Sequence, residues 1–310
     1  MQKNLSIMSL CAKFYKKRSF TAIFAGLIII LALIVVFFCR KPVILVTDNA
    51  FNVLYGKKRG LFKQFSLSLS LFRPVKTIAI AEGAGPDLVA QGAAGLSRRP
   101  LAAFFPYRYK DGALRYLQIR PGSPVIILAG RKPHKEEGND SAFWFYTDTV
   151  TDLYRAGGIA GLFAGYDRQN RDIALFYKEI DNSEKEAFIE GLEDQKWSGS
   201  PLFSPDSAEI NLACALILED FRFSEEEKSR SLILFSWMDP VLAPQRTLAI
   251  FDDSPWAQIS PALDLIGKGE QSGSIPSGII VCRGDKTQKS LYNGINRIKN
   301  LKKRTENTDN

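Results

Sequence analysis

The sequence is poor in the residues that usually bind metals or perform catalysis. It has one histidine, four cysteines and three methionines in 310 residues. His134 lies in a charged segment and is interpreted as a solvated residue, and the cysteines have no metal-ligand spacing. The chain also lacks a nucleophile elbow and a phosphate-binding Gly-Lys-Ser/Thr loop. We therefore expect no enzymatic activity, no metal and no cofactor.

Acidic residues are absent from the first forty positions, which hold six of the basic ones. The net charge of +8 therefore leaves only about +2 on the rest of the chain. This distribution removes the main support for a nucleic-acid partner. A second basic cluster occupies 285–310, which we expect to be a flexible, solvated tail, with contact to anionic lipid headgroups as the alternative.

Long apolar runs are also scarce, and the sequence has a single one, Phe20–Phe38. Nineteen residues at about 1.5 Å each nearly cross a hydrocarbon core of about 30 Å. Lys16, Lys17 and Arg18 precede the run and keep that end in the cytoplasm. We expect residues 1–40 to be a cytoplasmic stub with a membrane anchor or signal segment. The main domain would then lie outside the inner membrane, on its periplasmic side.

Cys39 follows the apolar run at the place where a bacterial lipoprotein is cleaved and lipidated. Phe37 and Phe38 are bulkier than the small residues that this processing prefers. The run is also longer than the apolar region of most signal peptides. Two interpretations stand: an uncleaved anchor with an incidental cysteine, and a lipoprotein lipidated at Cys39. Both tether the protein to the membrane.

The exported part alternates short apolar strands with helices, which predicts a mostly parallel sheet. About 270 residues suit two α/β lobes better than one small core. We place an N-terminal lobe at 41–146 with a return strand at 277–284, and a C-terminal lobe at 147–276. The segment Asn211–Leu218, with Cys214, is interpreted as a helix, and Gly267–Pro276 as a connection. The predicted fold class is α/β, with two Rossmann-like lobes joined by a hinge.

The second lobe is expected to begin with a glycine-ridged helix. Gly157, Gly161 and Gly165 are four residues apart between Tyr154 and Tyr166, so they share one helical face. A face without side chains lets the helix lie close to a neighbour, at a cost in helix propensity. A strand at Ile173–Tyr177 and a second helix at Lys185–Leu192 complete an α–β–α unit.

Three segments resemble the basic membrane protein family. They are Val46–Asn52 with an Asp–x–x–Phe–Asn pattern, Tyr154–Gly161 with a Tyr–x–Ala–Gly–x–x–Ala–Gly pattern, and Ala249–Ser254, a strand that ends in acidic residues. The resemblance spans residues 42–284. It implies a membrane-anchored substrate-binding protein of the type I periplasmic-binding fold. Characterised members of that family bind purine nucleosides for import.

In such a fold, ligand contacts come from loops at the carboxyl ends of the strands. Polar groups there are suited to hydrogen bonds with hydroxyls, and aromatic rings to stacking on a planar base. Helix capping is an equal interpretation of the Asp and Asn residues, tight-turn geometry of the glycines, and core packing of the aromatic rings. The candidate ligand-binding residues are Asp48, Asn49, Phe51, Asn52, Glu82, Gly83, Asp252, Asp253 and Trp256.

The sequence thus favours a membrane-anchored solute receptor that passes a small polar ligand, with a nucleoside as the candidate, to an ABC-type importer. The alternative is a binding-protein fold that has changed or lost its ligand and acts as a sensor or scaffold in the cell envelope. The retained anchor, the basic tail and the absence of the family's lysine after the last acidic strand motivate this alternative.

Overall fold

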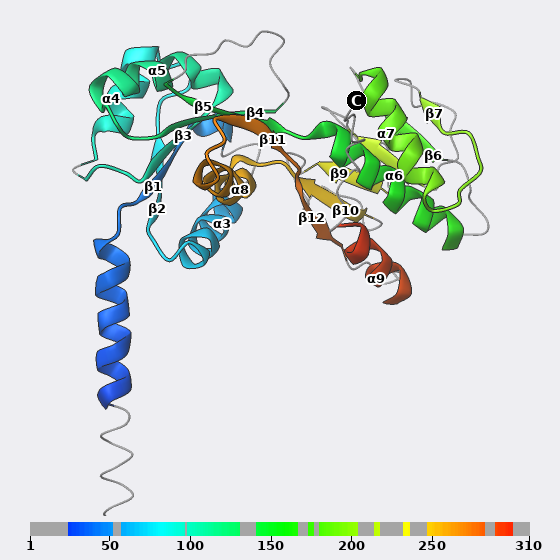
Figure 1. Cartoon of the computed structure of the whole chain (residues 1–310), viewed down its shortest axis with the longest axis horizontal. Helices are drawn as coiled ribbons and strands as arrows, with labels where there is room; N and C mark the ends of the chain where they lie inside the picture. The colour runs from blue at the N-terminus through cyan, green and yellow to red at the C-terminus, as the bar shows by residue number, and fades with distance from the viewer. Residues whose placement is uncertain are drawn as a thin grey trace, which may run out of the picture.

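The first lobe is built on a parallel sheet of six strands (Figure 1). The computed structural model describes residues 24–51, 57–96, 98–130, 141–166, 173–176, 180–203, 214–217, 232–235, 247–282 and 289–299. The strand order is β11-β5-β4-β3-β1-β2, and every pair is parallel. The strands are β1 (Val43–Thr47), β2 (Val75–Ala79), β3 (Ala102–Pro106), β4 (Val125–Ala129), β5 (Phe143–Thr147) and β11 (Ser272–Ile275).

Helices cover both faces of this sheet, which explains why its central strands are apolar throughout rather than alternating. Val43 and Leu45 face a core shared with α3 (Lys57–Ser70) and α8 (Pro255–Gly267). Ile44 and Val46 face a second core shared with α4 (Pro86–Ala94) and α5 (Lys110–Ile119). The period-2 side-chain alternation of β1 therefore divides its residues between two buried layers. A short 3₁₀ helix, η1 (Tyr107–Tyr109), links β3 to α5.

The second lobe has a sheet of order β12-β10-β9-β8-β6-β7. All neighbours are parallel except β10 and β12, which are antiparallel. The strands are β6 (Ile173–Phe176), β7 (Leu202–Phe203), β8 (Cys214–Ile217), β9 (Leu232–Phe235), β10 (Thr247–Asp252) and β12 (Gly278–Val281). The core of this lobe is shared with α6 (Thr149–Tyr166), α7 (Asn182–Glu193) and α9 (Lys289–Ile298). The predicted two-lobed α/β architecture is confirmed.

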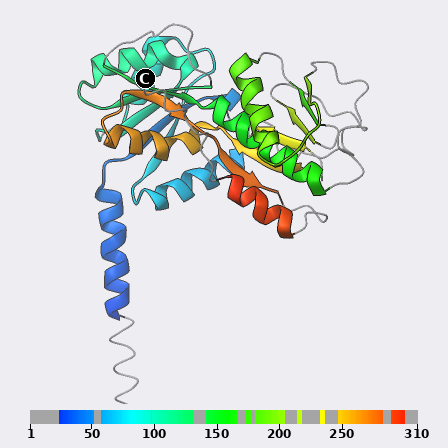
Figure 2. The same cartoon turned by 45° about the vertical axis from the view of Figure 1, so that its right-hand side comes forward.

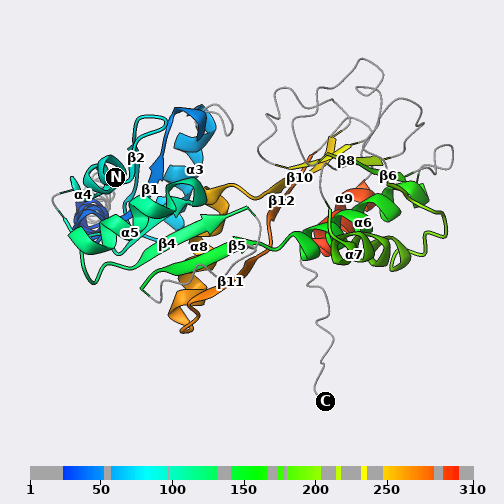
Figure 3. The ribbon, with the colours of Figure 1, turned by 90° about the horizontal axis from the view of Figure 1, so that it is seen from above.

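The chain crosses between the lobes three times (Figure 3). It passes from β5 to α6, returns from β10 to α8, and passes again from β11 to β12. This pathway corrects the expected lobe boundaries. β11 completes the first sheet, and 278–281 pairs with β10 in the second sheet, so the return strand is not 277–284. Gly267–Pro276 contains a strand because β11 pairs in register with β5.

Two further expectations are wrong within the described residues. Cys214–Ile217 is a strand rather than part of a helix, because these apolar residues pair with both β6 and β9. A short apolar run does not distinguish the two structures by itself. Residues 289–299 are not a free tail: Leu291, Ile295 and Ile298 of α9 are buried in the second core.

Residues 24–39 of the expected anchor form a helix that projects from the first lobe (Figures 1 and 2). Its large apolar side chains other than Phe37 are exposed, with values from 47% to 63%. Among the described residues, no helix meets both the length and the apolarity that a membrane crossing requires. The predicted run also includes 20–23, which lie outside the described residues.

The glycine ridge of α6 packs against α7. A Cβ atom on Gly157 would overlap the carbonyl oxygen of Phe188, and one on Gly191 of α7 would overlap the carbonyl oxygen of Tyr154. Gly161 is also close to α7, whereas a Cβ on Gly165 would meet no atom within 4 Å. Two of the three glycines in the ridge therefore allow the backbones of α6 and α7 to approach each other.

Gly157→Ala is expected to lower the free energy of unfolding by about 1–3 kcal/mol, because the added methyl group meets backbone atoms that cannot rotate away. Gly165→Ala on the same helix is the matched control. It should be neutral or stabilising by up to about 1 kcal/mol, since alanine has the higher helix propensity. Chemical denaturation of both variants measures the difference. Equal effects would show that the ridge does not set the packing distance.

Candidate functional site

The carboxyl ends of the strands in both lobes face the crossing segments. The chain leaves the first sheet at the carboxyl end of β5 and the second at the carboxyl end of β10. Because nearly all strands are parallel, the carboxyl ends of the other strands lie on the same side of each sheet. The residues that follow β1, β2 and β3 therefore share one edge of the first lobe.

A buried carboxylate organises this edge. Oδ1 of Asp48 accepts hydrogen bonds from the backbone N–H of Phe51 (2.8 Å) and from Nη2 of Arg108 (2.5 Å). Oδ2 accepts one from the Tyr109 hydroxyl. Burial raises the pKa of Tyr109 to about 12, and the hydrogen bond to Asp48 acts in the same direction, so the phenol stays protonated. Asp48 thus caps the start of a helix and binds an arginine, and both of its carboxylate oxygens already accept hydrogen bonds from the protein.

Other polar groups on this edge remain accessible. Asn49, Glu82 and Gly83 are exposed, and Gly83 adopts a φ of 72°, which favours glycine. The Arg108 side chain is 39% exposed. Only one of its nitrogen atoms donates to Asp48, and a guanidinium carries five N–H donors. Arg108 is therefore fixed at the edge with donors left for an anion or a hydroxyl.

Phe51 and Trp256 do not lie on the surface of this edge. Each is only 4% exposed, and their rings meet edge to face with centroids 6.2 Å apart. Both belong to the core beneath α3 and α8. The structure therefore gives these two rings the packing role, and neither can stack on a ligand in this arrangement.

Asp252, at the end of β10, is held by a lysine from the other lobe. Nζ of Lys63 on α3 lies 2.7 and 2.6 Å from its two carboxylate oxygens, and the Ser254 hydroxyl donates to Oδ1 at 2.5 Å. Lys63 also donates to the Ser254 hydroxyl oxygen at 2.9 Å. Asp252 is 8% exposed, so this ion pair links the lobes instead of leaving the carboxylate open to a ligand. Asp253 is half-buried beside it.

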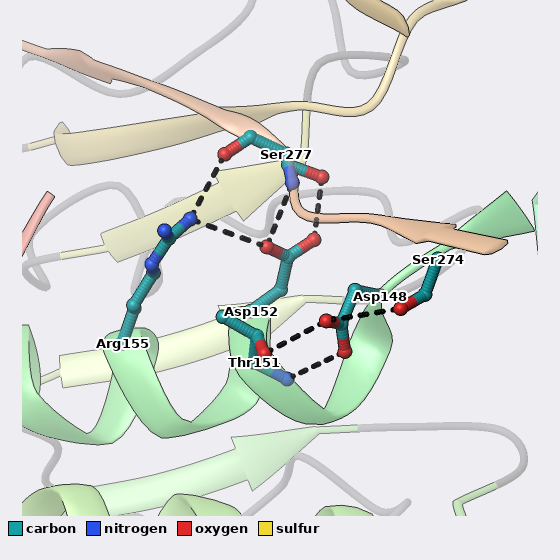
Figure 4. Close-up of polar contacts among 6 residues, drawn as sticks. All are labelled: Asp148, Thr151, Asp152, Arg155, Ser274 and Ser277. Atoms are coloured by element: carbon teal, nitrogen blue, oxygen red, sulfur yellow. Dashed lines mark hydrogen bonds and ion pairs between the residues drawn. The ribbon is translucent and has the colours of Figure 1, made fainter. Parts of the chain in front are cut away.

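A second buried carboxylate, Asp152 of α6, holds the crossing from β11 to β12 (Figure 4). Asp152 is fully buried and accepts hydrogen bonds from the backbone N–H of Ser277 (2.9 Å) and from its hydroxyl (2.5 Å). Nη1 of Arg155 lies 3.9 Å from Asp152 and donates to the Ser277 carbonyl at 3.3 Å.

Burial raises the pKa of Asp152 to about 7, although the bonds from Ser277 and the charge of Arg155 oppose the shift. The charge of Asp253 adds to the shift, and Asp148 faces Arg155 from the start of α6. This carboxyl is therefore poised to change its protonation near neutral pH.

The crossing from β5 to α6 is capped by Asp148 (Figure 4). Its carboxylate accepts hydrogen bonds from the Thr151 backbone N–H (3.0 Å) and hydroxyl (2.8 Å). Ser274 of β11 donates to the same carboxylate at 3.4 Å. Thr147, the last residue of β5, accepts a hydrogen bond from Gln258 of α8 at 2.8 Å. The three crossings are thus joined by polar contacts as well as by the chain.

Several important residues were missed from the sequence. Arg108 and Tyr109 follow β3, and the strand-end rule that selected Asp48 and Glu82 would have found them. Lys63 is 189 residues from Asp252 and has no local signal. Among the earlier candidates, Asn52 lies outside the described residues, and Cys39 is exposed at the end of helix 24–39.

No protein-family model and no curated protein sequence matches this chain. Solved structures do match. An ABC transporter solute-binding protein from Conexibacter woesei has a TM-score of 0.54 and 10% identity, over 84% of this chain and 94% of that one. A transcriptional activator of the comK gene from Bacillus halodurans has a TM-score of 0.52 and 9% identity, over 83% and 95%.

The chain has the type I periplasmic-binding fold. Two observations support this fold. The chain forms two mostly parallel sheets joined by three crossings. It is also similar to 94% of the length of a solute-binding protein. At 10% sequence identity, this similarity is evidence for the fold alone. The expected fold class is therefore confirmed.

The protonation of Asp152 predicts a pH-dependent stability. The pKa is about 7 in the folded state and 3.8 without the fold, so folding favours the protonated acid. This contribution is complete below pH 3.8 and is lost as the pH rises to about 7, a change on the order of 4 kcal/mol at most. Asp152→Asn should remove this slope when the free energy of unfolding is measured between pH 4 and 8. The exposed control Asp87→Asn should retain it, and an unchanged slope in Asp152→Asn would contradict the assignment.

The ion pair between the lobes predicts that removing the lysine alone destabilises the fold more than removing both charges. Lys63→Met leaves the carboxylate of Asp252 without its cation and should lower the free energy of unfolding by about 1–3 kcal/mol. Adding Asp252→Asn to Lys63→Met should recover part of that loss, because the unpaired charge is removed. A double-mutant cycle measured by chemical denaturation gives the coupling, and additive effects would show that the pair contributes nothing.

Proposed function

We propose that this protein is a membrane-anchored solute-binding protein that captures a small polar ligand for an ABC-type importer. The observation that carries the proposal is the accessible polar edge of the first lobe, placed at the strand ends that face the crossings. Ligands of α/β proteins bind beside such strand ends. The structural similarity to an ABC transporter solute-binding protein supports the same class.

The ligand contacts in the first lobe are Arg108, Asn49, Glu82 and Gly83, and Asp253 is the contact beside the crossing from β10. Arg108 is the central one, because Asp48 and the ring of Tyr109 (5.1 Å from its guanidinium carbon) fix its position before any ligand arrives. A fixed donor loses little conformational entropy on binding. Carboxylate, phosphate or hydroxyl oxygens are the groups that this arginine recognises.

The ligand is proposed to be a nucleoside, on the resemblance of Val46–Asn52 and Tyr154–Gly161 to the basic membrane protein family. The sugar hydroxyls would bind Arg108 and Asn49. The base would need a partner other than Phe51 and Trp256, since these rings are buried. The anchor is proposed to be the apolar run 20–38, most of which lies in helix 24–39, and it keeps the two lobes on the periplasmic side of the inner membrane. Lipidation of Cys39 is the second route to the same location.

The test is isothermal titration of the detergent-solubilised full chain with adenosine, guanosine, inosine and uridine. At least one nucleoside should bind saturably, and Arg108→Gln should weaken its binding about tenfold or more, as expected for a hydrogen bond from a charged donor. Arg115→Gln, at an exposed position of α5, is the charge-matched control and should bind as the wild type does. A wild type that binds no nucleoside removes the nucleoside proposal.

The second candidate function is a sensor or scaffold without a small ligand. Two observations favour it. Lys63 binds the carboxylate of Asp252, and the rings of Phe51 and Trp256 are buried, so these groups contact the protein itself instead of a ligand. Small-angle scattering separates the two candidates. A receptor should become more compact when a bound nucleoside draws its lobes together, whereas a scaffold should keep its radius of gyration with every nucleoside tested.

A further inference from the structure

A wide-open surface cavity of about 280 Å³ with cationic lining residues lies where helix 24–39 joins the first lobe. It is lined by Cys39, Lys41, Arg98 and Arg99. A cavity needs only roughly 15 Å³ to hold one water molecule, so this one has room for a phosphate group. Three of its four lining residues carry a positive charge, and none is acidic.

The cations of this cavity are held in place by neutral oxygen atoms. Nη1 of Arg98 donates to the Phe38 carbonyl at the end of helix 24–39 (3.0 Å). Arg99 donates to the Ser123 hydroxyl and the Pro121 carbonyl, both at 3.1 Å. Within the described part of the chain, no carboxylate forms an ion pair with Lys41, Arg98 or Arg99. The positive charge of the cavity is therefore not neutralised by these residues.

More positive charge surrounds the cavity. Nη1 of Arg73 lies 3.5 Å from the Lys41 carbonyl, and Arg40 stacks over the ring of Phe72 at 5.0 Å. Burial lowers the pKa of Arg73, and the nearby charge of Arg40 lowers it further. Five cations thus gather around the end of one apolar helix, an arrangement that an anion would stabilise.

The helix α3 lies on the side of the first lobe from which helix 24–39 projects (Figures 1 and 2). It exposes an apolar stripe. Leu61, Phe62, Phe65 and Leu69 are 61%, 72%, 61% and 56% exposed. The opposite face of α3 packs against the core through Leu67, and Leu71, directly after the helix, packs against the same core. Phe72, just beyond α3, meets Phe37 of helix 24–39 with ring centroids 5.9 Å apart. The stripe therefore begins beside the proposed anchor. An apolar helix face next to clustered cations is typical of a surface that contacts a membrane.

We propose that Lys41, Arg98 and Arg99 bind the phosphate of an anionic phospholipid in the bilayer that holds helix 24–39, with the α3 stripe resting on that bilayer. This inference depends on the proposed anchoring. If the helix lies in the hydrocarbon, its end at Cys39 reaches the headgroups, and the cavity lies at the depth of the lipid phosphates. The site would fix how the first lobe stands on the membrane, independently of any ligand at the strand ends.

Native mass spectrometry of the full chain in mild detergent, titrated with phosphatidylglycerol or phosphatidylcholine, tests this proposal. The wild type should retain phosphatidylglycerol selectively. Lys41→Gln/Arg98→Gln should bind it about tenfold or more weakly, since each cation near a membrane surface contributes to the attraction. Arg115→Gln/Lys268→Gln removes the same charge from exposed positions elsewhere on this lobe and should bind as the wild type does.

Three outcomes would overturn the lipid site. They are equal binding by the cavity variant and the wild type, an equal loss in the control variant, and displacement of the lipid by millimolar inorganic phosphate, which would indicate a site for small anions.

Lys41→Gln alone is the control for misfolding, because the structure gives this side chain no folding contact among the described residues. Two other measurements test the proposed function separately. Retention of the protein in the membrane fraction tests the anchor, and nucleoside titration tests ligand binding. Failure of the lipid site can therefore be distinguished from failure of the anchor or of the receptor function.

Discussion

The structure depends on one constraint: the chain crosses three times between two mostly parallel sheets, always on the side where the parallel strands end. Each crossing is short, with only one or two residues between the elements that it joins. The crossings place the residues that follow the strands opposite one another, and they concentrate the polar groups of the protein there. Buried Asp152, holding Ser277 through two hydrogen bonds, is the clearest example. The local carboxylates satisfy the backbone and side-chain donors that the crossings would otherwise bury without partners.

On this side of the molecule, the partner of each acidic residue determines what that residue can do. Asp48 and Asp252 are paired with Arg108 and Lys63, so they act through these cations rather than directly on a ligand. The first pair leaves an arginine at an accessible edge. The second pair joins the two lobes. Any change in the relative orientation of the lobes must therefore lengthen or break the ion pair between Lys63 and Asp252.

The sequence predicts the repeated features of this fold well and the long-range ones poorly. Apolar runs bounded by turns locate β1, β3, β4 and β10, because burial on both faces leaves a local signature. The path of the chain after β10 has no such signature: β11 and β12 are equally short, and only pairing decides which sheet each joins. The candidate site follows the same division. Asp48 is found from its place after β1, whereas the burial of Phe51 and Trp256 depends on contacts between segments two hundred residues apart.

The last crossing has a consequence for how the protein acquires its structure. The first sheet gains its edge strand β11 only at residues 272–275, and the second gains β12 and α9 later still. Neither lobe is a continuous segment, so the first core is complete only when β11 has joined it, and the second only when α9 has. Residues 43–147 alone therefore cannot form the finished first lobe, which must wait for α8 and β11, and these two elements follow most of the second lobe in the chain.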